Sequence, residues 1–184
     1  METKTKIKNV LAIALLALGL NATAQDKPVT LPEAADHYDQ GFRLGFGLNG
    51  GYVFEEPYDF SLGADVRLQY DLSKRTSVTL TTGFTNLFIG DDMKDLGFIP
   101  VKAGFKGFIW EDQFYLLGEV GAGFAVTNDY NKTSLILSPG IGYVPSKYID
   151  LSLRYEYYND FPNTLSDNRG VGQLALRIAY GFKL

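Results

Sequence analysis

Hydrophobic and polar residues alternate strictly along the last segment of the chain. From Leu174 to Leu184 every even position is large and apolar or aromatic, while the odd positions from Gln173 to Lys183 are small, polar or charged. Successive side chains of a β-strand point to opposite faces, so this segment would have one apolar and one polar face. It is therefore predicted to be a strand that separates two different environments.

Seven earlier segments show the same period of two. Together with the last one they predict eight strands, over residues 41–53, 59–71, 76–89, 97–109, 113–126, 133–145, 148–159 and 170–183. Strands of about 13 residues are long for a globular sheet, but a tilted strand of that length crosses an apolar band about 25 Å tall. The expected fold class is all-β: an eight-stranded antiparallel up-and-down transmembrane β-barrel.

The connections between these segments alternate in length. Short links follow the second, fourth and sixth segments, whereas longer or more acidic links follow the first, third, fifth and seventh. Short periplasmic turns opposite longer external loops are typical of outer-membrane barrels, which have both termini in the periplasm. The even strand number and this asymmetry favour a closed barrel.

Alternation alone does not say which face meets lipid. A soluble lipocalin-like periplasmic barrel that binds an apolar ligand would have the same period, with its apolar face inside. The polar face here is rich in glycine, which weakens a solvated strand but leaves room in a narrow lumen. The aromatic residues near strand ends suit interfacial girdles; examples are Tyr52, Tyr70, Tyr143, Tyr148, Tyr180 and Phe182. We therefore expect the polar face inside, and keep the lipocalin-like barrel as the alternative.

Residues 1–24 have the pattern of a cleavable signal peptide. Lys4, Lys6 and Lys8 precede an apolar run over residues 10–20, and small residues follow at 22–24. A membrane-anchor helix is the alternative, but it needs roughly 20 apolar residues. The predicted organisation is a signal peptide over 1–24, a periplasmic N-terminal lead over 25–40 and an outer-membrane barrel over 41–184.

The charge of the chain limits the classes of binding partner that are expected. Without the three lysines and one glutamate of residues 1–24, the 17 basic and 21 acidic residues of the chain fall to 14 and 20, a formal charge of −6. An acidic chain argues against a nucleic-acid partner. The acidic residues in the external links, such as Glu55, Asp91 and Asp95, are expected to favour turns and solubility. The alternative is divalent-cation binding near lipopolysaccharide phosphates, although these residues lack the full loop pattern of an EF-hand.

Nine charged residues fall on the face assigned to the lumen. They are Arg43, Asp65, Arg67, Lys102, Lys106, Glu119, Arg154, Glu156 and Arg177. Isolated charges are costly to bury, so we expect an ion-pair network that plugs the lumen, for example Glu119 or Glu156 with Arg154, Arg177 or Arg43. The alternative is a narrow, slightly basic pore for small solutes. A plug is favoured because eight strands enclose little more than their own side chains.

The sequence contains few residues that are suited to catalysis or to metal binding. Serine-hydrolase-like barrels need a histidine beside the nucleophile, and the single histidine, His37, lies in the N-terminal lead. With no cysteine and one histidine, no transition-metal cluster is expected. We therefore expect a non-enzymatic protein with no cofactor and no metal.

Pro139 stands in the middle of the sixth segment. Proline has no N–H to donate to a sheet, so a bulge or irregular hydrogen bonding is predicted at this position.

Taken together, the chain resembles the OmpA- and OmpX-like family of small eight-stranded outer-membrane barrels of Gram-negative bacteria. The resemblance covers the signal and most of the remaining chain. Its local motif is the C-terminal assembly signal of this class, here Arg177, Ala179, Phe182 and Leu184, with alanine where glycine is usual and leucine where phenylalanine is usual. The resemblance implies a porin-like outer-membrane location, a structural role, and contact as a monomer with lipid, lipopolysaccharide and the barrel assembly machinery.

Overall fold

The computed structural model describes residues 41–90, 95–109, 113–127, 133–161 and 170–184. The expected signal peptide, the N-terminal lead with His37, and parts of four links lie outside these residues. The described residues form eight strands: β1 (Phe42–Val53), β2 (Tyr58–Ser73), β3 (Thr76–Ile89), β4 (Leu96–Ile109), β5 (Phe114–Ala125), β6 (Thr133–Ser146), β7 (Ile149–Tyr158) and β8 (Val171–Lys183).

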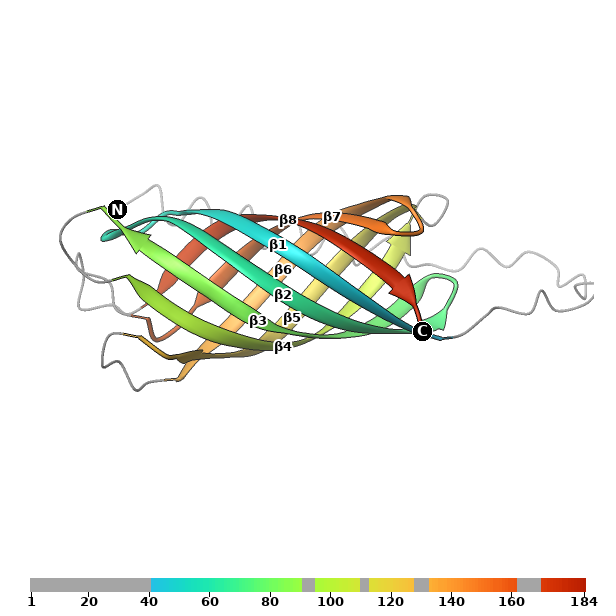
Figure 1. The fold of residues 1–184 in the computed structure, drawn as a ribbon, viewed down its shortest axis with the longest axis horizontal. Coiled ribbons are helices and arrows are strands. Elements are labelled where there is room, and N and C mark those ends of the chain that lie inside the picture. Colours follow the sequence, from blue (N-terminus) through green and yellow to red (C-terminus); the bar gives the residue numbers. More distant parts are fainter. Residues whose placement is uncertain (1–40, 91–94, 110–112, 128–132, 162–169) are drawn as a thin grey trace, which may run out of the picture. The chain divides into compact units, whose positions relative to one another are not determined.

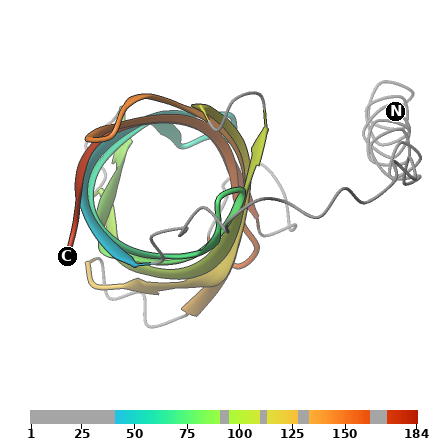
Figure 2. The ribbon, with the colours of Figure 1, turned by 90° about the vertical axis from the view of Figure 1, so that its right-hand side faces the viewer.

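Each strand pairs antiparallel with its neighbours in the sequence, and β8 pairs with β1 to close the barrel. The strands run obliquely to the barrel axis, and the view along that axis shows a closed ring (Figures 1 and 2). The structure thus confirms the predicted fold class. In the described part of the chain no helix is long and apolar enough to span a membrane.

The two ends of the barrel differ in their connections. At one end, here named the turn end, β2 joins β3 and β6 joins β7 through tight turns, and β1 begins beside the end of β8. At the other end, named the loop end, lie the links that follow β1, β3, β5 and β7.

The two faces of the sheet have opposite character. Large apolar side chains on the outside are exposed, as at Leu48 (70%) and Ile178 (56%), while Arg154 and Arg177 inside are 2% and 1% exposed. An apolar outer surface of this extent is costly in water but suits the hydrocarbon of a bilayer. The arrangement confirms the predicted orientation of the faces and is the reverse of a lipocalin-like barrel.

Two prolines interrupt the hydrogen-bonded ladders. Between β6 and β7 the pairing steps from Leu137 to Gly140 and omits Pro139, which is paired with Gly118 on its other side. The irregularity predicted at Pro139 is therefore confirmed, and the register is the same on both sides of it. Pro100 in β4 lies at a similar interruption of the β3–β4 ladder, which was not predicted.

Candidate functional site: the barrel lumen

The middle of the lumen holds ion pairs from five strands, joined by one amide side chain from a sixth. We name as the charge network the side chains of Asn49, Asp65, Arg67, Lys102, Glu119, Arg154, Glu156 and Arg177. All but Asn49 are among the predicted lumen residues, and every charged member is buried. The alternation of the strands places these side chains inside, since each lies on the face opposite the apolar one.

Glu119 on β5 is surrounded by donors from three other strands. Its Oε1 accepts hydrogen bonds from Arg67 Nη2 (2.8 Å) and Thr81 Oγ1 (3.0 Å). Its Oε2 accepts from Arg154 Nη1 (3.3 Å) and lies 3.5 Å from Lys102 Nζ. One fully buried carboxylate therefore balances several buried cations.

Glu156 on β7 forms a second group of contacts. It accepts hydrogen bonds from Lys102 Nζ (2.7 Å), Tyr158 Oη (2.6 Å) and Gln173 Nε2 (2.8 Å). Arg154 Nη1 lies 3.6 Å from the same carboxylate. Lys102 and Arg154 thus each lie between Glu119 and Glu156, which joins the two groups.

The third carboxylate, Asp65 on β2, faces the seam between β1 and β8. Arg177 Nη2 donates to Asp65 Oδ1 at 2.5 Å, and Arg177 Nε lies 2.9 Å from Oδ2. Asn49 Nδ2 also donates to Asp65 (2.7 Å), while Asn49 Oδ1 accepts from Arg154 Nη2. Asn49 therefore connects the Asp65 pair to the rest of the charge network.

Glycines make room for these long side chains. A Cβ on Gly47 would lie 2.7 Å from Arg177 Nε, and one on Gly104 would lie 2.6 Å from Glu119 Cγ. Because such contacts are far too short, larger residues at these positions would displace the ion pairs. This is the spatial reason for the glycine-rich inward face.

Two further ion pairs lie nearer the turn end. Lys106 Nζ is 2.6 Å from Asp150 Oδ2, and Asp150 Oδ1 accepts a hydrogen bond from Tyr115 Oη (2.5 Å). Arg43 Nε is 2.8 Å from Asp71 Oδ2. Lys106 is buried, whereas the side chain of Arg43 is 41% exposed. All nine predicted lumen residues thus lie inside the barrel.

Some partners differ from those used as examples in the sequence analysis. Glu119 and Glu156 do contact Arg154. However, Arg177 forms its ion pair with Asp65, and Arg43 forms its ion pair with Asp71. Asp71 and Asp150 were missed because they stand at strand ends, where aspartate is read as a turn residue. Extending the two-residue alternation to those ends would have placed both inside.

The loop end of the lumen is apolar. We name as the loop-end cluster the buried residues Val53, Tyr58, Leu87, Leu96, Phe98, Ile136, Tyr158, Phe161 and Val171. The rings of Phe98, Tyr158 and Phe161 pack on one another with centroids 4.9–5.2 Å apart. The two-residue alternation predicts small or charged side chains along the whole lumen, so this apolar cluster is a feature that the pattern did not predict.

The residues of the expected assembly signal divide between the two faces. Arg177 and Ala179 are buried in the lumen, while Phe182 faces outward and stacks with Phe46 at 6.5 Å. Leu184 lies just beyond β8, and its N–H donates to Phe42 O (2.9 Å). Among the described residues no group of three or more His, Cys, Asp or Glu side chains could hold a metal ion.

A closed antiparallel barrel with an apolar exterior and buried ion pairs defines the chain as a small transmembrane β-barrel by fold. Solved structures agree. Ail, the attachment invasion locus protein of Yersinia pestis, has a TM-score of 0.55 at 22% identity, over 78% of this chain and 99% of that one. The N-terminal β-barrel domain of Pseudomonas aeruginosa OprF has a TM-score of 0.55 at 12% identity, over 78% and 99%. A de novo designed transmembrane β-barrel has a TM-score of 0.51 at 16% identity, over 79% and 99%.

No protein-family model and no curated protein matches the chain. At the identities above, the likeness shows the fold and not the activity.

Proposed function

We propose that this chain is an integral protein of a bacterial outer membrane, with a structural, membrane-integrity role and a lumen closed by its own side chains. The observation that carries the proposal is the charge network inside an apolar-faced barrel. A lumen filled with buried ion pairs leaves little room for a continuous water path, and separating any of those pairs is costly.

The two blocks inside the lumen differ in chemistry. An ion entering from the loop end would have to displace the packed rings of Phe98, Tyr158 and Phe161, and then separate the pairs of Glu119 and Glu156. Each step carries a desolvation cost, because the ion would exchange its hydration shell for apolar rings or for side chains that are already paired. A narrow pore, the alternative function, requires both blocks to open.

A non-enzymatic role fits the buried carboxylates. Glu119, Glu156 and Asp65 each lie against cationic or hydrogen-bonding side chains, and none lies in an apolar pocket that would favour proton transfer.

The remaining elements of the proposal concern export and surroundings. Residues 1–24 would direct export and be removed, residues 25–40 would lie in the periplasm, and the turn end would face the periplasm. The C-terminal residues Arg177 to Leu184 would be recognised by the barrel assembly machinery. The monomeric barrel would contact phospholipid and lipopolysaccharide through its apolar exterior.

Two measurements test this function. The protein from a washed outer-membrane fraction should migrate differently on SDS gels before and after boiling, because a closed barrel resists SDS until it is heated. In planar lipid bilayers it should then show no steady conductance, and Phe98→Ala combined with Phe161→Ala should also stay closed, because the ion pairs of the charge network remain. Recovery in the soluble periplasm, or steady conductance of the unaltered protein, would contradict the proposal.

A further inference from the structure

A groove crosses the outer face of the barrel. Its volume is about 530 Å³, within the range of about 300–1,000 Å³ that is usual for ligand sites. Its walls are outward side chains of β8, β1 and β2, and its floor is the backbone between them. We name it the outer groove.

The register of the strands explains the shape of the outer groove. Ala179, Gly47, Asp65 and Gly83 pair in one row across β8, β1, β2 and β3, and all four line the groove. They belong to the inward set of positions, so none of them places a side chain on the outer face. The row therefore leaves a furrow between the two rows of outward side chains that flank it.

The walls of the outer groove are apolar. One wall consists of Tyr180, Phe46 and Val66, and the other of Ile178, Leu48 and Ala64. Ala64 is paired with Leu48 on one side and with Phe84 on the other, so a small side chain stands between two large ones. The second wall is therefore low at β2, which widens the furrow there.

The outer groove runs from near the turn end toward the middle of the barrel. Ala179 lies four residues from the turn end of β8, whereas Asp65 lies eight residues from the turn end of β2. Four neighbouring strands span about 14 Å, which is about half the thickness of the hydrocarbon core of a bilayer. The groove thus suits a tilted acyl chain that belongs to one leaflet.

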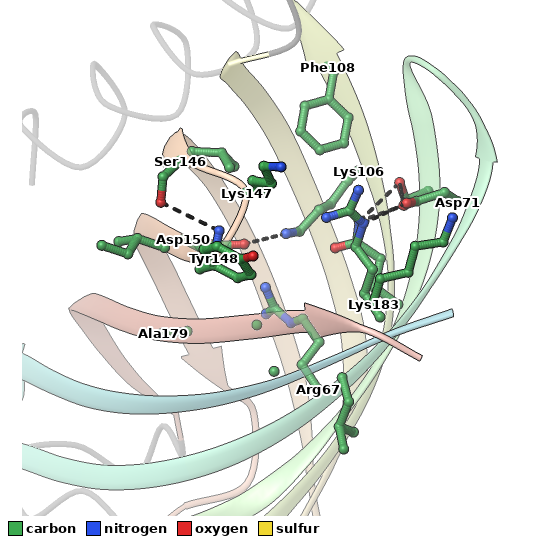
Figure 3. A pocket seen from close by; sticks show the side chains of 18 of the residues that line it. Arg67, Asp71, Lys106, Phe108, Ser146, Lys147, Tyr148, Asp150, Ala179 and Lys183 are labelled. Carbon is green, nitrogen blue, oxygen red and sulfur yellow. Dashed lines mark hydrogen bonds and ion pairs between the residues drawn. The ribbon is translucent and has the colours of Figure 1, made fainter. Parts of the chain in front are cut away.

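Two tyrosines stand where the outer groove begins. The ring of Tyr148 stacks on that of Tyr180, with centroids 5.7 Å apart and 11° between the planes. Tyr148 lies on the turn between β6 and β7 (Figure 3), where its N–H donates to Ser146 Oγ (3.4 Å) and its carbonyl accepts from Gly181 N–H (2.7 Å). Tyrosines at the ends of lipid-facing strands lie at the level of the headgroups. A chain in the groove would therefore have its headgroup beside this pair.

We propose that the outer groove binds one acyl chain of a glycerophospholipid from the leaflet at the turn end, with the headgroup beside Tyr148 and Tyr180. The site rests on the proposed function, since it requires the outer face to lie in a bilayer. Lipid chains are as apolar as the barrel surface, so hydrophobicity alone holds none of them in place. A furrow touches a chain on three sides and gains dispersion contacts that a flat surface does not offer. One lipid would thus stay bound while its neighbours exchange.

The test is native mass spectrometry of the barrel, reconstituted in vesicles of phosphatidylethanolamine, phosphatidylglycerol and lipid A and then released in a mild uncharged detergent. Ala64→Phe places a ring in the outer groove. Ala103→Phe is the matched control, because Ala103 is also an exposed alanine on the outer face but does not line the groove. Both substitutions keep the surface apolar, and folding is checked by the shift of the band on boiling. If Ala64→Phe does not fold, Ala64→Leu replaces it, with Ala103→Leu as its control.

We expect the unaltered barrel to retain a single phospholipid, identified by its mass. The retained fraction should fall about tenfold in Ala64→Phe and less than about twofold in Ala103→Phe, because only the first ring fills the space of the chain. A folded barrel that retains no lipid, retains lipid A instead, or loses the phospholipid equally in both variants would overturn the site and leave the proposed function standing. A protein that shows no shift on boiling would refute the proposed function, and the site with it.

Discussion

Replacing Glu119 by glutamine tests whether the charge network stabilises the barrel. The side chain of Glu119 is 0% exposed and accepts from Arg67, Thr81 and Arg154, with Lys102 Nζ at 3.5 Å. Glutamine has almost the same shape, so the substitution removes the charge and leaves no cavity. It also turns one acceptor into an N–H₂ donor that faces cations.

The expected cost follows from the cations left behind. Removing one partner of a buried ion pair typically costs about 3–5 kcal/mol, because the remaining charge is uncompensated. Glu119 balances three cations and only Glu156 remains near two of them, so we expect the upper part of that range. Domains are stable by only about 5–15 kcal/mol, so a loss of this size moves the unfolding midpoint clearly.

The assay is urea unfolding of the barrel in lipid vesicles, with the folded fraction read from the unheated band on SDS gels. Glu56→Gln is the matched control, since it makes the same chemical change at an exposed loop position and should alter stability by less than about 0.5 kcal/mol. If Glu119→Gln does not fold, Arg67→Met should be added, because removing both charges should restore folding. A loss below about 1 kcal/mol for Glu119→Gln would refute the reasoning.

Two further substitutions test the packing of each face. Gly142→Ala should cost about 1–3 kcal/mol in the same urea assay, because its Cβ would lie 2.0 Å from Tyr115 Cζ, whereas Gly107→Ala, with no atom within 4 Å, should be near neutral; equal losses would contradict the spatial role of Gly142. Leu48→Arg, in the middle of the outer face, should lower the free energy of unfolding in vesicles by about 2–4 kcal/mol. Phe54→Arg, just beyond the end of β1, should lower it much less. Equal tolerance at the two positions would place the hydrocarbon band elsewhere.

Much of the fold follows from a single property of the sequence, its period of two. That period predicted the eight strands to within about two residues at each end. In a long strand with two different faces, each residue gives independent evidence for the same orientation. The period also placed Arg67, Glu119 and Arg177 inside. Barrel closure followed from strand number and loop asymmetry.

Partner choice inside the lumen could not be read from the same pattern. Arg177 contacts Asp65 across an intervening strand, so the pair depends on the tilt and stagger of the barrel and not on neighbouring positions in the sequence. The loop-end cluster departs from the alternation, because the inward face there is apolar and not polar. The runs Leu87-Phe88-Ile89 and Phe98-Ile99 carry the missing signal, since consecutive apolar residues place apolar side chains on both faces.

The charge network bridges the seam at which the two ends of the sheet meet, and this bears on the order of folding events. Arg177 on β8 reaches Asp65 on β2, and Arg154 on β7 reaches Asn49 on β1. Neither contact can form while β1 and β8 are apart, so an open sheet would hold these charges in water and gain nothing from them. A join displaced by two residues would move Arg177 by about 6–7 Å and bury it away from Asp65. The seam contacts would thus stabilise only the correct register between β1 and β8. The last step of assembly would then be an all-or-none event that disfavours misaligned barrels.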